Sequence, residues 1–235
     1  LVSSFPAARV GRLDRDVASG AGTEAVLEKL RNHDIDILVG TQMVTKGHDV
    51  PRVALVGVIA ADAALSFPDF RANERTFQLL SQVAGRAGRR ELPGHVVIQT
   101  WQPDHPVLAF AKAHNFEAFY HAEIVARREL GYPPYGRMAA VRMDGPDEQV
   151  LRATATRMEA FLRALPDVAM NLVRVLGPAP SPIERIRGRF RMQTMLRAPD
   201  RPPLRRVLGH LVDALDAYTR DDVRVALDID PVNML

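Results

Sequence analysis

The sequence contains no cysteine and no long apolar run, and these two absences exclude several classes of protein. Without cysteine the chain can form neither a disulfide nor a thiolate metal site, as is usual in a reducing cytoplasm. No stretch is apolar over the length that a bilayer-spanning helix needs. The first residues, LVSSFPAARV, lack the basic and apolar regions of a signal peptide. The sequence therefore predicts a cytoplasmic protein with no membrane partner.

Lysine is scarce, because only Lys29, Lys46 and Lys112 are lysines among the 31 basic residues. The dominance of arginine is compatible both with a GC-rich genome and with phosphate recognition. The net charge of +3 is too small to indicate nucleic-acid binding by itself. With 235 residues, of which 47% are hydrophobic and 25% charged, the chain is expected to form one or two globular domains.

A phosphate-binding loop of the form G-x-x-x-x-G-K-[ST] is also missing, together with the acidic magnesium-binding motif that usually accompanies it. The chain begins with Leu1 rather than methionine. We therefore interpret the sequence as part of a longer protein.

Residues 1–105 alternate between short apolar runs and helical patterns. Strands are expected at 8–13, 35–39, 53–60 and 95–100, and helices at 23–32, with Thr23 as its cap, and at 74–84. Two of the runs, at 35–39 and 53–60, are apolar at nearly every position, which is typical of strands buried on both faces of a parallel sheet. The pattern predicts an open α/β layer, a parallel sheet with flanking helices.

The character changes after residue 105. A helical linker is expected over 106–135, and it ends in a Tyr-Pro-Pro-Tyr turn at 132–135, where proline stops any helix. Residues 136–235 are predicted to form a separate domain in the order β-α-β-β-α-β. Its strands are expected at 137–143, 172–176, 188–197 and 223–230, and its helices at 147–165 and 203–218. That order fits a small α+β domain of the ferredoxin-like kind.

The most specific pattern is a pair of arginines that follow a predicted helix. The segment runs Gln82-Val83-Ala84-Gly85-Arg86-Ala87-Gly88-Arg89, with each arginine directly after a glycine. Glycine permits close backbone approach and unusual dihedral angles. Two forked, permanently charged guanidinium groups on one side of a turn suit a transferring phosphoryl group. The pattern favours a phosphate-contacting turn over a solvated basic one.

A second pattern follows the predicted strand at 35–39. The strand runs into Gly40-Thr41-Gln42, and Lys46-Gly47-His48-Asp49 comes shortly afterwards. Open α/β sheets bind ligands at the carboxyl ends of their strands. Thr41 offers a hydroxyl to a phosphate oxygen, Gly47 permits close approach, and Asp49 offers an acceptor to a sugar hydroxyl. The alternative interpretation is an ordinary strand followed by a turn.

Together the two patterns resemble motifs V and VI of superfamily 2 helicases, which mark the second RecA-like lobe. The sequence between them, DAALSFPDFRANERTFQLL at 62–80, resembles one family within that superfamily, the primosomal protein N′ family of replication-restart helicases. The Tyr-Pro-Pro-Tyr turn at 132–135 and the ending Asp-Ile-Asp-Pro at 228–231 are similar to the same family. The resemblance covers nearly the whole chain and is strongest for the C-terminal part of such proteins.

The resemblance implies roles for individual residues. Arg86 and Arg89 would be catalytic and contact the nucleotide γ-phosphate, with Gln82 orienting their turn. Nucleotide binding would also involve Gly47 and Asp49, which would couple the nucleotide and DNA sites. The family position of Asp49 is variable. The residues that would meet DNA are Thr41, Gln42 and Lys46.

The resemblance also implies an activity, namely ATP-dependent 3′→5′ DNA unwinding at stalled forks and primosome assembly. The cofactors would be ATP and Mg²⁺, with zinc held only by an upstream part of the protein. The partners would be branched and single-stranded DNA, single-strand DNA-binding protein and other primosome proteins. Two alternatives remain open: a catalytically silent DNA-structure-binding scaffold of the primosome, or another superfamily 2 translocase. Because the phosphate loop is missing, we expect this chain alone to be inactive.

A third pattern lies in the last domain. If the segment 186–193 lies on a strand, alternation places Arg187, Arg189, Arg191 and Gln193 on one face and Phe190 and Met192 on the other. The arginine face is either an ordinary solvated surface or a strip for DNA phosphates or for the acidic tail of single-strand DNA-binding protein.

Two weaker patterns have ordinary interpretations. His114, Glu117 and His121 would share one helix face, but metal-binding histidines are usually four apart, so no metal site is expected. The single tryptophan, Trp101, is interpreted as a core or interface residue rather than one that stacks on a base.

Overall fold

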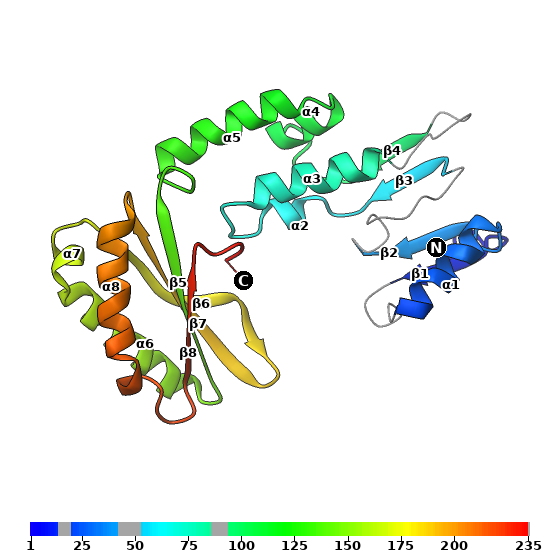
Figure 1. The fold of residues 1–235 in the computed structure, drawn as a ribbon. Helices are drawn as coiled ribbons and strands as arrows, with labels where there is room; N and C mark the ends of the chain where they lie inside the picture. The colour runs from blue at the N-terminus through cyan, green and yellow to red at the C-terminus, as the bar shows by residue number, and fades with distance from the viewer. Residues whose placement is uncertain (14–19, 42–52, 86–93, 235) are drawn as a thin grey trace. The chain divides into compact units, whose positions relative to one another are not determined.

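The computed structural model describes residues 1–13, 20–41, 53–85 and 94–234 (Figure 1). These residues group into two compact units. The first comprises 1–66 and 73–116, and the second comprises 67–72 and 117–235. The short segment 67–72 therefore belongs with the second unit, although it lies in the sequence among residues of the first.

The first unit contains two pairs of parallel strands with helices between them. Strand β1 pairs with β2, and β3 pairs with β4. In chain order the elements are β1 (Val10–Leu13), α1 (Gly20–Arg31), β2 (Ile37–Gly40), β3 (Leu55–Val58), α2 (Asp62–Leu65), α3 (Ala72–Ala84), β4 (His95–Ile98) and α4 (Pro106–Lys112). The prediction of parallel strands alternating with helices is confirmed for this unit.

Helix α1 begins three residues before the expected start. Thr23 lies inside the helix, so the prediction that it is the cap is wrong. The expected apolar face is present, because Leu27 is completely buried and Val26 and Leu30 are half-buried.

The pair β3–β4 departs from the expectation that its strands are buried on both faces. Leu55 on β3 is 61% exposed and Val97 on β4 is 58% exposed, whereas their neighbours Val56 and Val58 are half-buried. The side chains alternate along each strand, so the exposed residues share one face. The described residues therefore cover only the opposite face of this pair.

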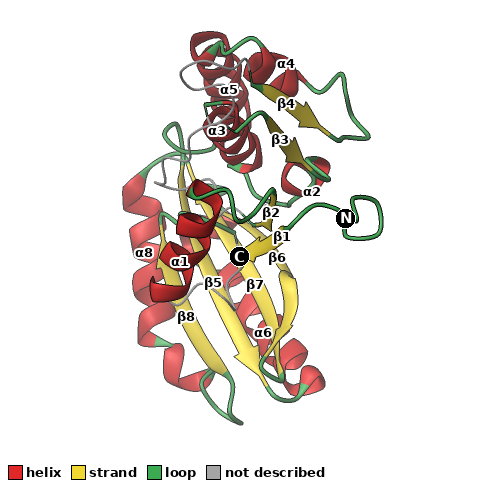
Figure 2. Ribbon diagram, turned by 90° about the vertical axis from the view of Figure 1, so that its right-hand side faces the viewer, coloured by secondary structure: helices red, strands yellow, loops and turns green. Residues whose placement is uncertain are grey.

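The second unit is a four-stranded sheet with helices on one face (Figure 2). Its elements are α5 (Phe116–Leu130), β5 (Arg137–Gly145), α6 (Glu148–Ala164), α7 (Pro166–Ala169), β6 (Arg174–Ile186), β7 (Arg189–Ala198), α8 (Arg201–Asp213), the 3-10 turn Leu215–Ala217 and β8 (Arg224–Ile229). The strand order is β6-β7-β5-β8, and each neighbouring pair is antiparallel. The predicted helical stretch at 106–130 forms two helices, and His114 lies in the turn between them with φ of 51°, not on a helix face.

The main core of this unit lies between the sheet and helices α6 and α8. Alternation along β5 sends Ala139, Val141 and Met143 into this layer, where all three are buried. Helix α6 begins at a well-formed cap, because the Asp147 carboxylate accepts hydrogen bonds from the backbone N–H groups of residues 149 and 150 at 2.8 and 3.0 Å. The sequence pattern alone predicts this layer, because the apolar period matches each element.

The opposite face of the sheet carries a smaller core that the sequence pattern does not predict. It consists of Met138, Ala140 and Met195, against which Phe70, Tyr132 and Met234 pack. Phe70 thus brings the segment 67–72 onto the sheet.

Among the described residues no helix is both long and apolar enough to span a bilayer.

Aromatic rings and cations hold the segment 67–72 in place. The rings of Phe70 and Tyr132 stack with centroids 5.4 Å apart. The guanidinium carbons of Arg71 and Arg127 lie 5.3 and 5.4 Å from the Phe70 ring centre, and that of Arg197 lies 4.8 Å from the Tyr132 ring centre. The segment is therefore anchored by two stacked rings and by three arginines that contact them.

A buried carboxylate fixes the backbone of the same segment. Asp69 is only 8% exposed, and its two oxygens accept hydrogen bonds from the N–H groups of Arg71 at 2.9 Å and of Met234 at 3.3 Å. The second bond ties residues 165 positions apart in the sequence. The end of the chain thus helps to close this face of the sheet.

Candidate nucleotide and nucleic-acid interface

Helix α3 leads directly into the predicted arginine turn. Its buried face consists of Thr76, Phe77, Leu80 and Val83, whose spacing is that of one helix face. Gln82 lies on the exposed side. The helix ends at Ala84, two residues before Arg86, as the sequence predicts. Arg86 and Arg89 lie outside the described residues.

Gly85 does not have the conformation that its place in the pattern suggests. An added Cβ would meet only the carbonyl oxygens of Ser81 and Gln82, at 3.6 and 3.7 Å, which is ordinary contact. Its φ is outside the left-handed region, and its N–H donates to Ser81 at 3.1 Å as in a helix. Backbone strain therefore does not explain the glycine at position 85.

Thr41 lies directly after β2, at the carboxyl end of the first parallel pair, and its side chain is exposed. Gly40 pairs with Leu13 at the end of β1, so both strands end at the same edge. This edge is where open α/β sheets bind ligands. The other residues predicted here, Gln42, Lys46, Gly47 and Asp49, lie outside the described residues.

The amino end of the same strand pair is closed by an ion pair. Asp36 accepts hydrogen bonds from Nε and Nη2 of Arg9 at 2.9 and 2.8 Å, and from the backbone N–H of Arg9 at 2.8 Å. These hydrogen bonds hold the pKa of Asp36 well below its usual range. The pair fixes the start of β1 against the start of β2, so the edge at Thr41 has a defined register.

The carboxyl end of β4 is fixed by a carboxylate that sequence reasoning missed. Asp62 accepts from the hydroxyl of Thr100 at 2.6 Å and from the N–H of Trp101 at 2.9 Å. These bonds, the Thr100 bond first, lower the pKa of Asp62. The indole of Trp101 is 87% exposed, so within this structure Trp101 is not a core residue.

The predicted arginine strip does not form as a single strand face. Arg187 and Gly188 are the two central residues of the β6–β7 turn, with φ of 49° and 82°. A two-residue hairpin turn with both φ values positive matches the right-handed twist of its strands. The prediction that Arg187 lies on the strand is therefore wrong, and β7 begins only at Arg189.

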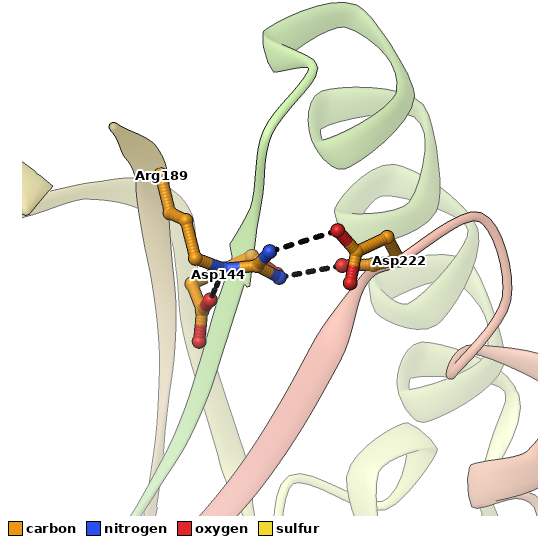
Figure 3. Close-up of polar contacts among 3 residues, drawn as sticks. All are labelled: Asp144, Arg189 and Asp222. Carbon is orange, nitrogen blue, oxygen red and sulfur yellow. Dashed lines mark hydrogen bonds and ion pairs between the residues drawn. The ribbon is translucent and has the colours of Figure 1, made fainter. Parts of the chain in front are cut away.

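Arg189 is held inside its own domain (Figure 3). Its Nε donates to a carboxylate oxygen of Asp144, and its Nη1 donates to the carboxylate of Asp222 at 3.0 Å. Its Nη2 donates to the backbone carbonyls of Asp222 and Asp144 at 2.5 and 3.2 Å. The bond to Asp144, followed by that to Asp222, raises the pKa of Arg189. Arg189 therefore fastens β7 to β5 and to the loop before β8.

The other two members of the strip also face their own domain. Arg191 donates to the carbonyl of Ile183 at 3.4 Å. The Oε1 atom of Gln193 is buried and has no hydrogen-bond partner among the described residues. Its cross-strand neighbour Arg142 donates to Asp228 at 3.0 Å and to the carbonyl of Asn233 at 2.8 Å. The four side chains of the predicted strip therefore do not form one uniform surface, because Arg187 lies in the turn, Arg189 and Arg191 bond within the domain, and the Gln193 oxygen is buried.

The alternate residues of β7 lie where alternation predicts. Met192 is buried in the main core, and Phe190 packs against it from a half-buried position. The strand is therefore correctly oriented, and the error in the sequence-based interpretation concerns only where the strand begins.

Comparison with known proteins gives two family matches. Residues 7–91 match the helicase conserved C-terminal domain, and residues 128–232 match the primosomal protein N C-terminal domain. The first match contains both the segment after β2 and the paired arginines that follow α3 in the sequence.

Individual relatives align over the whole chain. The chain is 41% identical to the replication restart protein PriA of Bacillus subtilis, covering 100% of this chain and 29% of that protein. It is 39% identical to PriA of Synechocystis and 36% identical to PriA of Haemophilus influenzae, covering all of this chain and 27% and 32% of those proteins. The chain thus spans about a third or less of the length of these relatives. It belongs to the primosomal protein N′ (PriA) family and corresponds to the C-terminal part of its members.

Proposed function

We propose that this chain is the C-terminal part of an ATP-dependent 3′→5′ DNA helicase that acts in replication restart and primosome assembly at stalled forks. The observation that carries the proposal is the position of α3, which ends at Ala84 immediately before the paired arginines. The buried face of α3 fixes the helix that precedes these arginines, and the family match over 7–91 contains them. Helicases and primosome proteins work on DNA in the cytoplasm, which we propose as the location.

ATP and Mg²⁺ are the cofactors of the proposed reaction. Arg86 and Arg89 would contact the γ-phosphate, and Gln82 would orient their turn from the exposed side of α3. The chemistry fits, because paired guanidinium groups stabilise the charge that develops on a transferring phosphoryl group. Gly47 and Asp49 would complete this side of the nucleotide site. The phosphate loop would come from an upstream part of the protein, as would any zinc site.

DNA would meet the edge of the β1–β2 pair at Thr41, Gln42 and Lys46. The exposure of Thr41 at a carboxyl end supports this assignment. Branched or single-stranded DNA would be the substrate, with single-strand DNA-binding protein and other primosome proteins as partners.

Replacing Thr41 by valine in the full-length protein tests the DNA contact. Valine keeps the shape of the side chain and removes its hydroxyl. The loss of one hydrogen bond, worth about 0.5–1.5 kcal/mol, is expected to reduce the DNA stimulation of ATP hydrolysis by about two- to tenfold. The basal rate should stay unchanged. Thr219→Val, at an exposed threonine of the second unit, is the matched control. Equal DNA stimulation in Thr41→Val and wild type would remove Thr41 from the DNA path.

We also propose that the second unit is a ferredoxin-like domain. The order of its elements and the sheet order β6-β7-β5-β8 support this. We retain the division into a helicase lobe at 1–105, a helical linker at 106–135 and a C-terminal domain at 136–235. The two family matches, which end at 91 and begin at 128, support a linker between them.

The decisive experiment compares the full-length protein with this chain alone. The full-length protein should hydrolyse ATP in a DNA-dependent manner and unwind a forked duplex, and the isolated chain should do neither. A full-length protein that binds forks but hydrolyses no ATP would be a scaffold, and the helicase proposal would then fail.

A further inference from the structure

The β6–β7 hairpin of the second unit ends in an exposed tip that carries two arginines. Strand β6 lies at the edge of the sheet, where its prolines at 178, 180 and 182 are tolerated because edge strands need fewer ladder hydrogen bonds. Its pairing with β7 is interrupted between Pro180 and Arg185 and resumes only at the last two residue pairs before the turn. Figure 1 shows the hairpin, in yellow, extending to the side of the sheet away from α6 and α8.

Every residue from 183 to 188 is exposed. This tip carries two arginines, Arg185 and Arg187, and one acid, Glu184. It also exposes two large apolar side chains, since Ile183 and Ile186 are 44% and 42% exposed. A surface that combines cations with bare isoleucines has the chemistry of a contact site rather than of an ordinary solvated turn.

The two tip arginines differ sharply from Arg189, which lies two residues after Arg187 and is bonded within its own domain. Within the described part of the chain, Arg187 forms no hydrogen bond or ion pair. Arg185 lies over the Phe190 ring at 4.7 Å, which fixes its side chain while leaving its N–H groups unbonded within the described residues. Arg189, by contrast, is committed to Asp144 and Asp222. The hairpin thus has an anchored base and a tip with available guanidinium groups.

The shape of the hairpin narrows the choice of partner. A two-stranded β-ribbon fits the major groove of duplex DNA. Guanidinium groups on such a ribbon can reach the phosphates beside the groove, and exposed isoleucines can contact the groove wall. The shallow pocket beside the hairpin, where a side chain of a bound peptide would have to fit, is lined by both signs of charge, Glu148 and Glu184 with Arg152 and Arg191, so it does not favour an acidic peptide.

We propose that the tip of the β6–β7 hairpin binds the backbone of duplex DNA, with Arg185 and Arg187 on phosphates and Ile183 and Ile186 against the groove. The proposal deepens the proposed function, on which it rests for the choice of DNA. The Arg189 ion pairs hold the base of the hairpin in one conformation before DNA binds, so little conformational entropy of the backbone is lost on binding.

The test uses the full-length protein and a fluorescent DNA duplex, with affinity measured by anisotropy at several salt concentrations. The double variant Arg185→Ala/Arg187→Ala should bind the duplex roughly tenfold more weakly at low salt. The slope of log K against log salt should shrink by about 1.8, because each lost phosphate contact removes about 0.9. The control is Arg201→Ala/Arg205→Ala, which removes the same charge from exposed positions of α8, on the helix-covered side of the sheet. It should keep the wild-type slope.

A second variant tests the apolar contact. Ile183→Ser/Ile186→Ser should weaken binding at every salt concentration and leave the slope unchanged, because it removes no charge. A thermal melt of each hairpin variant should stay close to that of the wild type, since all four substituted side chains lie at the exposed tip.

Three results would overturn the proposal. These are a wild-type salt slope in the arginine variant, an equal loss in the α8 control, or a variant that loses binding to an acidic peptide while keeping its affinity for the duplex. The proposed function fails separately: wild-type protein that binds the duplex through the hairpin but shows no DNA-dependent ATP hydrolysis would sink the helicase assignment and leave the hairpin assignment standing.

Discussion

Alanine at Arg86 or at Arg89 in the full-length protein is expected to lower kcat for DNA-stimulated ATP hydrolysis by about 10³-fold or more. The reason is that an arginine at the γ-phosphate acts mainly on the charge that develops in the transition state. Binding of ATP should therefore weaken much less than the rate. Steady-state hydrolysis with a saturating forked DNA, together with a nucleotide-binding titration, separates the two effects.

Lysine substitutions sharpen this test. Arg86→Lys and Arg89→Lys keep the positive charge but lose the planar fork that contacts two oxygens, so they should recover only a small part of the rate. Arg205→Ala, at an exposed arginine of α8 in the second unit, is the control for nonspecific loss of charge. Wild-type kcat in both alanine variants would mean that the turn after α3 has no role in hydrolysis.

Local sequence patterns were sufficient to predict the buried side of an element wherever the spacing of its own apolar residues determines that side. Helix α3 shows this, because the spacing of its apolar residues indicates which side is buried. The helix ends at Ala84, directly before the glycine-arginine motif. Strand β7 shows it too, since alternation places Met192 in the core. In such cases the period of the side chains carries the information.

Turn chemistry explains the main error in the candidate sites. The interpretation of 186–193 as strand placed Arg187 on a strand face, whereas Arg187 and Gly188 form the hairpin turn. The glycine at 188, between apolar runs, is the signal that could have indicated a two-residue turn. The partners of Arg189 were not predictable, because Asp144 and Asp222 lie 45 and 33 residues away in the sequence.

Long-range docking explains why the segment 67–72 groups with the second unit. No local pattern indicates that 67–72 joins the second unit, since no break in the sequence separates this segment from α3, which begins at Ala72. What decides the matter is the complementary face, where Met138, Ala140 and Met195 leave room for an aromatic ring. Burial of Phe70 against this apolar face favours the place of the segment on the second unit.

Phe70→Ala is accordingly expected to destabilise the second unit by about 2–4 kcal/mol. A fully buried phenylalanine costs about 3–5 kcal/mol when truncated, and Phe70 is half-buried. The stack on Tyr132 contributes about 0.5–1.5 kcal/mol beyond the buried area, and each arginine over the ring adds about 0.5–1 kcal/mol. All of these contacts disappear in the alanine variant.

Hydrogen exchange measured by mass spectrometry on β5 and β7 reads out this loss without depending on the first unit. Amides of these strands that exchange only through unfolding of the sheet should exchange about 30-fold faster for each 2 kcal/mol lost, since 1.4 kcal/mol is a factor of ten. Trp101→Ala is the matched control, because it removes a larger ring that is 87% exposed and belongs to the first unit. It should leave exchange in β5 and β7 unchanged. Equal protection of these strands in Phe70→Ala and wild type would show that the segment 67–72 rests on the sheet without stabilising it.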